Sequence, residues 1–473
     1  MLVSDVQQTV TRELQRIAPI IDELGARFTG AGHQLALVGG PVRDAMLGRL
    51  QNDLDFTTSA HPDVTEKLLK GWADAIWDMG RSFGTIGCRK GEWQVEITTY
   101  RSEAYDAGSR KPEVAYGDSL AGDLGRRDFT VNSMALTVPD RGFEDPFGGI
   151  VDLASRVLRT PGRPEDSFSD DPLRMLRAAR FAAQLGFDVA PEVVAAMTEM
   201  AGRIEIISAE RVRDELVKLI CAPFPRRGLL LLVETGLASY VLPELPALAL
   251  ERDEHHRHKD VYEHTLIVLE QSIDQESRLG GPDFISRFAA LMHDVGKPRT
   301  RRFEAGGVVT FHHHDVVGAK ITRKRMKALR FSNDEVEAVS KLVELHLRFH
   351  GYGEGEWTDS AVRRYVRDAG DQLERLHILT RADCTTRNQR KANRLRAAYD
   401  DLEARIERLS EEEELASIRP DLDGTQIMEI LGIPPGREVG EAYKFLLELR
   451  MDDGPQSEEA ARDALLAWWG SRS

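Results

Sequence analysis

The 473-residue sequence contains only three cysteines, Cys88, Cys221 and Cys384, and they lie far apart along the chain. This spacing argues against a disulfide scaffold and fits the reducing cytosol. No apolar run approaches the roughly 18 residues that a membrane-spanning helix needs. Residues 1–30 alternate charged with apolar positions, which predicts an amphipathic helix and no signal peptide. We therefore expect a cytoplasmic protein and exclude the secreted, membrane and fibrous classes.

Basic residues are fewer than acidic ones. Lys and Arg number 63 against 78 Asp and Glu, which gives a net charge of −15. This is the wrong sign for a protein that coats nucleic acid over its whole surface. The basic residues gather in local clusters at 323–330, 363–367 and 387–396, and the acidic run 411–414 is typical of a solvated helix face. Any binding of nucleic acid should therefore be confined to one face.

The pattern of apolar residues changes once along the chain. Strand-like stretches at 34–40, 54–58 and 93–100 alternate with expected helices at about 41–48 and 62–71, which predicts an α/β head with a mixed sheet. Beyond Pro161 the apolar spacing follows the helical period and predicts an all-helical body. The expected parts are an N-terminal helix (1–30), a head (31–158), a helical neck (159–250), a histidine-rich helical domain (251–390) and a C-terminal helical tail (391–473).

Two features of the head suit phosphate and metal chemistry. Gly39 and Gly40 end the first strand, and glycines let backbone N–H groups approach a phosphate closely, although an ordinary tight turn explains them equally well. Asp53 and Asp55 alternate along the next strand and so point to the same face. Two carboxylates held there repel each other unless a divalent cation lies between them, and Mg²⁺ prefers oxygen ligands. Glu96 on the third strand is a candidate third carboxylate.

Further motifs follow in order along the chain. They are RRDFTVNSM at 126–134, DPFGG at 145–149, DPLR at 171–174 and ERV at 210–212. With the strand–GG–VRD–helix and DxD elements, this order resembles the class II tRNA nucleotidyltransferases and bacterial poly(A) polymerases of the polymerase-β-like superfamily. The resemblance implies a polymerase-β-like head, and a neck that selects the nucleotide and binds RNA.

The resemblance also implies roles for individual residues in the head. Asp53 and Asp55 would bind two Mg²⁺ ions, one activating the RNA 3′ hydroxyl and one holding the triphosphate. Asp128 and Asn132 would contact the ribose, and Arg127 the triphosphate. The nucleotide-phosphate turn would comprise Gly39, Gly40, Arg43 and Asp44. The alternative for any one of these residues is a structural arginine–carboxylate network around the turn.

Asp171 and Arg174 lie at the start of an expected helix. Asp171 precedes a proline and so lies near the N-cap, while Arg174, Arg177 and Arg180 recur every three residues. A salt-bridged helix would explain this pattern. Under the resemblance, Asp171 and Arg174 would instead present hydrogen-bonding edges complementary to cytosine or adenine, so that the protein and not a template selects the base. Asp170 stands where the family usually has Glu, which keeps the charge.

A polar, turn-rich segment follows Arg101 and runs to Leu120. It resembles the family's flexible loop, which helps to switch addition from C to A. Its ordinary length favours a complete CCA-adding enzyme over one restricted to CC.

Ten of the thirteen histidines fall between His255 and His350. His264, the pair His293-Asp294, and Asp383 resemble the HD superfamily of metal-dependent phosphohydrolases, and these residue types suit Mn, Ni, Zn, Fe or Mg. A second ion would draw on His312, His313, His314 and His346. Three adjacent histidines cannot all face one site, so at most two of them bind it. We expect His255, His256 and His258 to be surface residues.

The leading hypothesis is template-independent addition of CCA to tRNA 3′ ends from CTP and ATP, with release of pyrophosphate. RNA would contact the basic stretches 323–330 and 387–396. A poly(A) polymerase would share all these motifs, but its family members tend to carry Pro-Lys where this chain has Gln51-Asn52. An alternative of another class is an HD phosphohydrolase with a non-catalytic RNA-binding head. The intact Asp53, Asp55 and Arg127 argue against that alternative.

Overall fold

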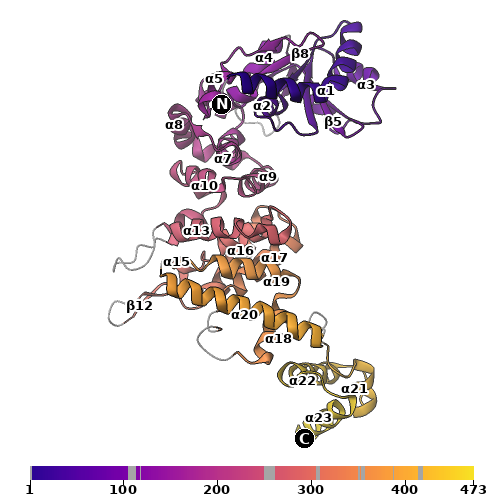
Figure 1. The fold of residues 1–473 in the computed structure, drawn as a ribbon, viewed down its shortest axis with the longest axis vertical. Helices are drawn as coiled ribbons and strands as arrows, with labels where there is room; N and C mark the ends of the chain where they lie inside the picture. The colour runs from indigo at the N-terminus through magenta and orange to yellow at the C-terminus, as the bar shows by residue number, and fades with distance from the viewer. Residues whose placement is uncertain are drawn as a thin grey trace. The chain divides into compact units, whose positions relative to one another are not determined.

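The computed structural model describes residues 3–472 except 105–112, 118, 250–260, 305–308, 350–351, 353–356, 387 and 414–418. The chain divides into two compact units, residues 1–241 and 242–473, and its colour in Figure 1 runs from indigo in the first to yellow at the end of the second. The boundary falls inside the expected neck, so that α12 (Glu244–Leu248) belongs with the second unit.

A seven-stranded mixed sheet forms the centre of the first unit, in the order β3-β4-β5-β2-β1-β8-β9. β2 and β5 run parallel, and the other neighbouring strands are antiparallel. The strands are β1 (Leu35–Val38), β2 (Asp53–Thr58), β3 (Ala75–Trp77), β4 (Thr85–Lys90), β5 (Trp93–Thr99), β8 (Ala135–Val138) and β9 (Phe143–Glu144). The mixed sheet confirms the expected α/β head. The sequence pattern predicts β1, β2 and β5 but misses the other four strands.

The alternation of β2 places its two aspartates on one open face. Asp53 and Asp55 are exposed, whereas Leu54 and Phe56 are buried in the core. In the register between β2 and β5, Asp55 lies directly opposite Glu96, which is also exposed. The three carboxylates therefore share one face of the sheet, as the sequence predicts.

Helices surround this sheet (Figure 1). α1 (Val3–Gly30) confirms the expected N-terminal helix and packs on β1, β8 and α2. The other elements around the sheet are α2 (Gly40–Met46), α3 (Pro62–Leu69), η1 (Arg81–Phe83), α4 (Leu120–Gly125), η2 (Thr130–Asn132) and α5 (Gly149–Ser155). β6 (Arg101–Ala104) and β7 (Glu113–Tyr116) form a hairpin. The centre of the segment that resembles the flexible loop, residues 105–112, lies outside the described residues.

Short helices complete the first unit. They are α6 (Pro164–Asp170), α7 (Leu173–Leu185), α8 (Pro191–Met200), η3 (Ala201–Ile206), α9 (Ala209–Ile220), α10 (Pro225–Glu234) and α11 (Ala238–Val241), with the small parallel pair β10 (Val157–Leu158) and β11 (Asp188–Val189). The almost entirely buried α7 packs against α9 and α10. This packing fixes the face of α7 that remains open.

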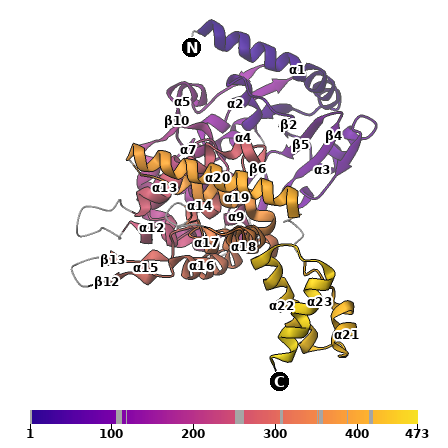
Figure 2. The same ribbon diagram turned by 60° about the horizontal axis from the view of Figure 1, so that its bottom comes forward.

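The second unit is mostly helical, and one short strand pair departs from the all-helical body that the sequence predicts. Its elements after α12 are α13 (Val261–Ile273), η4 (Glu276–Leu279), α14 (Phe284–Met292), α15 (Lys297–Thr300), the short pair β12 (Arg302–Phe303) and β13 (Val309–Thr310), α16 (His314–Ala328), α17 (Asn333–Leu345), α18 (Asp359–Ala369), η5 (Gly370–Gln372), α19 (Leu373–Ala382), α20 (Gln389–Glu413), α21 (Gly424–Leu431), α22 (Arg437–Asp453) and α23 (Glu458–Gly470). The long helix α20 lies along α18 and α19 (Figure 2). α21, α22 and α23 pack on an apolar core that includes Leu422, Ile427 and Leu465.

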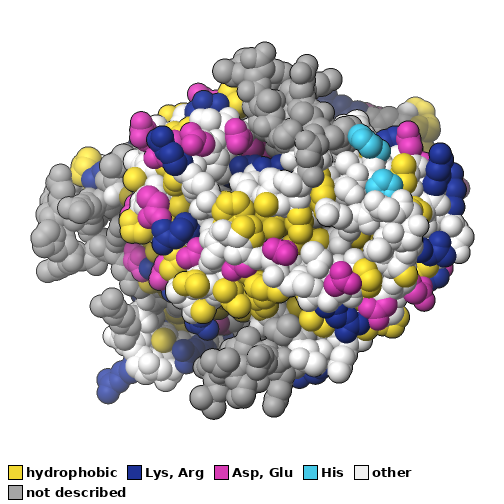
Figure 3. All heavy atoms as spheres, turned by 90° about the horizontal axis from the view of Figure 1, so that it is seen from above, with side chains coloured by type: hydrophobic (Ala, Val, Ile, Leu, Met, Phe, Trp, Pro, Cys, Tyr) yellow, Lys and Arg dark blue, Asp and Glu magenta, His cyan; other side chains and the backbone are white. Residues whose placement is uncertain are grey.

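The charges are mixed over the face drawn in Figure 3, where acidic and basic side chains are interspersed with apolar ones. This distribution agrees with a chain of net negative charge that does not present a continuous basic coat. Among the described residues, no helix combines the length and the apolar character that a bilayer crossing demands.

Candidate functional site

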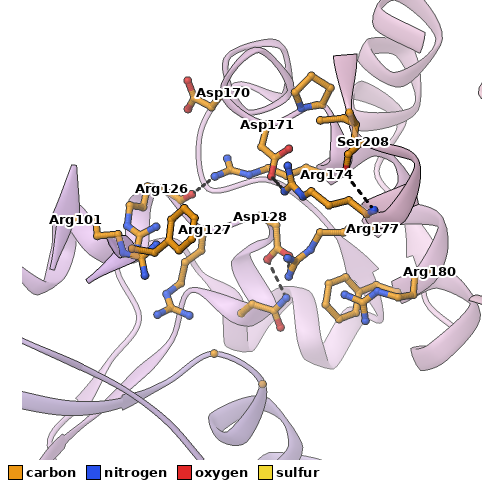
Figure 4. Close-up of a pocket in the computed structure, with 18 of the residues that line it drawn as sticks. Arg101, Arg126, Arg127, Asp128, Asp170, Asp171, Arg174, Arg177, Arg180 and Ser208 are labelled. Carbon is orange, nitrogen blue, oxygen red and sulfur yellow. Dashed lines mark hydrogen bonds and ion pairs between the residues drawn. The ribbon is translucent and has the colours of Figure 1, made fainter. Parts of the chain in front are cut away.

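A cavity of about 1500 Å³ opens in the first unit. Its walls come from the turn after β1, from the segment 126–132, from the start of α7, and from η3 and α9 (Figure 4). The basic residues on its walls are Arg43, Arg101, Arg126, Arg127, Arg174, Arg177, Arg180, Arg203 and Arg211, and the acidic ones are Asp55, Asp128, Asp170, Asp171 and Glu205. So many guanidinium groups favour a polyanionic ligand, because arginine matches phosphate geometry.

The glycine turn lies on the wall of this cavity. Gly39 has φ +73°, and a Cβ there would lie only 2.8 Å from Nη1 of Arg127, so a side chain would be strained and would displace that arginine. Arg43 is buried and donates to Asn132 Oδ1 at 2.5 Å. It also pairs with Asp44 at 2.8 Å. Arg43 thus ties the turn to the 126–132 motif.

Asp55 forms part of the cavity floor. Its side chain is open to the solvent of the cavity, yet the surrounding protein, together with Glu96 and Asp53, raises its pKa to about 6 against the opposing effect of Arg127. Crowded carboxylates on one face are a donor set that fits a divalent cation, whose charge relieves their repulsion. Asp53 and Glu96 share this face but are not part of the cavity wall.

Asp128 is held ionised inside the protein. It is 6% exposed and forms an ion pair with Arg177 at 2.6 Å, and Asn132 Nδ2 donates to it at 2.9 Å. Although burial opposes ionisation, Arg177 holds the pKa of Asp128 below its ordinary value. The wall of the cavity therefore includes a fixed negative group among the arginines.

Replacing Arg177 by Met leaves the Asp128 carboxylate without its cation. We expect a loss of roughly 1–3 kcal/mol in the free energy of unfolding, less than for a fully buried pair because Arg177 is partly exposed. Denaturant unfolding measures the change. The double variant Arg177→Met with Asp128→Asn should recover most of the loss, and equal destabilisation of the single and double variants would contradict the ion-pair account.

Asp171 and Arg174 are both anchored at the start of α7 (Figure 4). Asp171 accepts from the Leu173 N–H at 3.1 Å and from Arg211 Nη2 at 2.8 Å. Arg174 is buried and donates to Ser167 Oγ at 2.9 Å and to the Arg126 carbonyl at 2.5 Å. A helix does begin here, as predicted, and its N-cap residue is Pro172, directly after Asp171. These bonds fix a donor and an acceptor at the cavity wall.

Most of the residues predicted from the motifs meet in this cavity. Those on its wall are Gly39, Gly40, Arg43, Asp55, Arg127, Asp128, Asn132, Asp171, Arg174, Arg177 and Arg180. Asp44, Asp53 and Glu96 lie outside the wall. Sequence reasoning misses Ser82, Phe83, Thr98, Arg101, Arg203, Ile206 and the role of Arg211 as the partner of Asp171. Arg211 lies in the ERV motif at 210–212, so the motif could have identified it as a site residue.

The histidines of the second unit form a separate cluster. Ligand atoms of His264, His293 and Asp383 lie within 4.8 Å of one another, and so do those of Asp294, His314 and His346. The four residues predicted as one metal site do converge: His264 Nε2 lies 3.0 Å from Asp383 and 3.6 Å from Asp294. His314 and His346 extend the cluster.

The ring orientations in this cluster fit metal binding. Nδ1 of His293, His314 and His346 lies 2.8, 2.8 and 2.6 Å from a backbone carbonyl three residues earlier, which directs each Nε2 inward. The buried Nε2 atoms of His314 and His346 have no hydrogen-bond partner. Burial lowers the pKa of His346 to about 4, so its imidazole is neutral, the form that binds metals.

The three adjacent histidines at 312–314 differ in their exposure. The side chain of His312 is 67% exposed, and His313 is exposed with φ +60°. His314 alone of the three enters the cluster, in agreement with the limit of two. His255, His256 and His258 lie outside the described residues.

Three segments of the chain match known protein families. Family models match residues 35–159 ("Poly A polymerase head domain"), 186–248 ("Probable RNA and SrmB- binding site of polymerase A") and 261–388 ("HD domain"). The chain is 35% identical over 441 residues to an A-adding tRNA nucleotidyltransferase of Deinococcus radiodurans, covering 92% of this chain and 95% of the relative. The chain belongs to the tRNA nucleotidyltransferase and poly(A) polymerase family.

Other members of this family match more locally or by fold. A CCA-adding enzyme of Levilactobacillus brevis is 42% identical over 211 residues, which is 44% of this chain and 52% of the relative. The chain thus spans about half the length of this CCA-adding relative. The structure of a Bacillus stearothermophilus CCA-adding enzyme in complex with CTP aligns with a TM-score of 0.69 at 25% identity, over 97% of this chain and 98% of that one. Members of this nucleotidyltransferase family need a divalent metal.

Proposed function

We propose that this protein adds CCA to tRNA 3′ ends in the cytoplasm, using CTP and ATP and no nucleic-acid template. One observation carries the proposal: Asp171 and Arg174 face the same cavity as Asp55. A group suited to reading a base edge and a group suited to metal-dependent phosphoryl chemistry thus act on one bound nucleotide. The arginines of the cavity suit its triphosphate.

Each part of the chemistry has a residue in this cavity. Asp53 and Asp55 would hold Mg²⁺, which when bound supplies charge neutralisation and an activated 3′ hydroxyl. Arg127, packed on Gly39, and the neighbouring arginines bind the triphosphate and orient it for attack. Asp128 and Asn132 contact the ribose. Attack of the 3′ oxygen on the α-phosphorus forms the new phosphodiester and breaks the bond to pyrophosphate.

A second candidate is addition of the terminal A alone. The A-adding relative is matched over 95% of its length, whereas the CCA-adding relative of Levilactobacillus brevis is matched over 52%. Both activities use the same cavity chemistry, but they differ in which end of the RNA is accepted and in whether CTP is used as well as ATP. Poly(A) synthesis would likewise use this cavity, with many successive additions.

Staged tRNA transcripts separate these candidates. One transcript ends at the discriminator base and a second carries the two cytidines, and each is incubated with Mg²⁺ and with CTP, ATP or both. We expect two additions to the first transcript with CTP alone, one addition to the second with ATP, and a stop after three with both. Extension of the second transcript only would establish A addition, and a long ladder with ATP would establish poly(A) synthesis.

We propose that the RNA contacts two basic helices of the second unit. On α16, Arg323 and Arg325 pair with Glu337 and Glu244, whereas Lys324 and Lys327 are exposed. The exposed basic residues at the start of α20 are Arg390, Lys391, Arg394 and Arg396. Phosphate contacts of this kind make affinity fall steeply with salt concentration.

We also propose that the HD cluster holds a divalent ion, Mg²⁺ or a transition metal, and hydrolyses phosphate esters such as a 2′,3′-cyclic RNA end. The purified chain should bind Mn²⁺, measured by elemental analysis, and the His293→Ala, Asp294→Ala double variant should lose both the metal and the phosphate release. His312→Ala, at an exposed position outside the cluster, is the matched control and should retain both. Nucleotide addition by the double variant should persist, because the residues of the cavity belong to the first unit, whereas His293 and Asp294 belong to the second. Full metal content in the double variant would contradict this assignment.

A further inference from the structure

One aromatic side chain in the cavity lacks a role in the chemistry above. Phe83 lines the cavity and is 50% exposed. Among the large apolar side chains of the described cavity wall, only Ile206 is similarly exposed, at 49%. The rest of the wall is dominated by arginine and acidic groups. An open aromatic ring beside clustered cations is the combination that binds single-stranded nucleic acid, because every base has a face that can stack.

The turn that carries Phe83 is braced from both sides. The Phe83 N–H donates to the Gly80 carbonyl at 2.9 Å, and the Thr85 N–H donates to the same carbonyl at 3.0 Å. Arg81, two residues before Phe83, pairs with Asp63 and Glu66 on α3. The backbone around Phe83 is therefore fixed, and its ring is presented to the cavity by a rigid support.

The position of this turn in the sheet indicates which substrate it meets. The carboxylates Asp55 and Glu96 lie on the neighbouring central strands β2 and β5, and the sheet order is β4-β5-β2-β1. The phosphate turn at Gly39 follows β1, on one side of the carboxylates. Phe83 precedes β4, on the other side, where Thr85 pairs with Thr98 on β5. The incoming nucleotide and the RNA end must approach the metal-binding carboxylates from different sides.

We propose that Phe83 positions the RNA primer by stacking on the base of its 3′-terminal nucleotide. The inference rests on the proposed function, since it assigns the second substrate of the same site. Stacking there holds the terminal ribose near Asp55 while the nucleotide occupies the arginine-lined side. Because stacking is tolerant of base identity, one ring serves each successive end of the growing RNA.

The test measures kcat and KM separately for tRNA and for the nucleotide. Phe83→Ala should raise the KM for tRNA about 5- to 150-fold, as expected for loss of one base–aromatic stack, and leave the KM for CTP and ATP unchanged. Phe83→Tyr should restore the KM for tRNA, whereas Phe83→Leu, which keeps apolar volume without a ring, should not. Phe143→Ala is the matched control, since Phe143 is 42% exposed on β9 outside the cavity wall.

A primer with an abasic 3′-terminal nucleotide isolates the stack itself. The wild type should lose affinity for this primer, and Phe83→Ala should lose nothing further. An equal loss by Phe83→Ala on normal and abasic primers, a raised KM for the nucleotide instead of tRNA, or an unchanged KM for tRNA would each overturn the inference. If the wild type extends no primer, the proposed function itself fails, whereas extension with an unchanged Phe83→Ala overturns only this inference.

Discussion

Asp55→Asn abolishes nucleotide addition, with kcat/KM falling by at least about 1,000-fold, equivalent to about 4 kcal/mol of transition-state stabilisation. The substitution preserves shape and removes the charge that would hold the metal and the developing charge at the 3′ oxygen. Single-turnover extension of labelled tRNA, over CTP concentrations from well below saturation to saturation, measures this loss. Asp53→Asn should behave alike, because both aspartates share the open face of β2.

The same variant should not be less stable than the wild type. Because the folded protein raises the pKa of Asp55 from 3.8 to about 6, the charged carboxylate opposes folding at pH 7. Its unfavourable contribution grows as the pH rises between these two values and levels off above pH 6. Thermal unfolding in EDTA should give an equal or higher Tm for Asp55→Asn. Glu92→Gln, at an exposed position near the end of β4, is the matched control and should leave addition unchanged. Extension by Asp55→Asn at near wild-type rate would contradict the assigned role.

Arg174→Ala is the second variant with a large expected effect. Arg174 presents fixed donors to the cavity, anchored by Ser167 and by the Arg126 carbonyl. Its loss should lower kcat/KM for CTP and ATP about 100-fold and reduce discrimination against UTP and GTP, because a base whose polar edge loses its partner costs about 1–3 kcal/mol. Competition between nucleotides on one tRNA primer, with sequenced products, measures the discrimination.

Two companion variants separate base reading from support of α7. Ser167→Ala removes one anchor and keeps the guanidinium, so it should reduce discrimination less than Arg174→Ala. Arg213→Ala, on α9 outside the cavity wall, should leave it unchanged. If Arg174→Ala lowers the rate for all four nucleotides by the same factor, Arg174 supports the fold of the neck and does not read the base.

The parts of the site that depend on local patterns could be predicted from the sequence. Alternation along β2 placed Asp53 and Asp55 on one face, and the Gly39 turn and the start of α7 followed from glycine and proline positions. These features arise within a few residues of chain, where the strand and helix periods fix side-chain directions. The structure then brings Asp55, Arg127 and Arg174 to one cavity.

Features that depend on pairing between distant segments could not be predicted. β4 contains Gly87 and Cys88 and ends in Arg89 and Lys90, so its pattern does not mark a strand. Without β4 in its place in the sheet, nothing indicates that Phe83 reaches the cavity. Likewise the sequence limits how many of His312, His313 and His314 bind a metal but does not say which. That choice depends on where α16 begins and on its packing against α17.

The most direct test of the central claim is to sequence the 3′ ends formed from one tRNA transcript with all four nucleotides present at equal concentration and Mg²⁺. If side chains of this cavity select the base, transcripts ending at the discriminator base acquire C, C and A in that order and then stop. Runs of adenosine, or ends that reflect the nucleotide mixture, would contradict selection of C and then A by the protein.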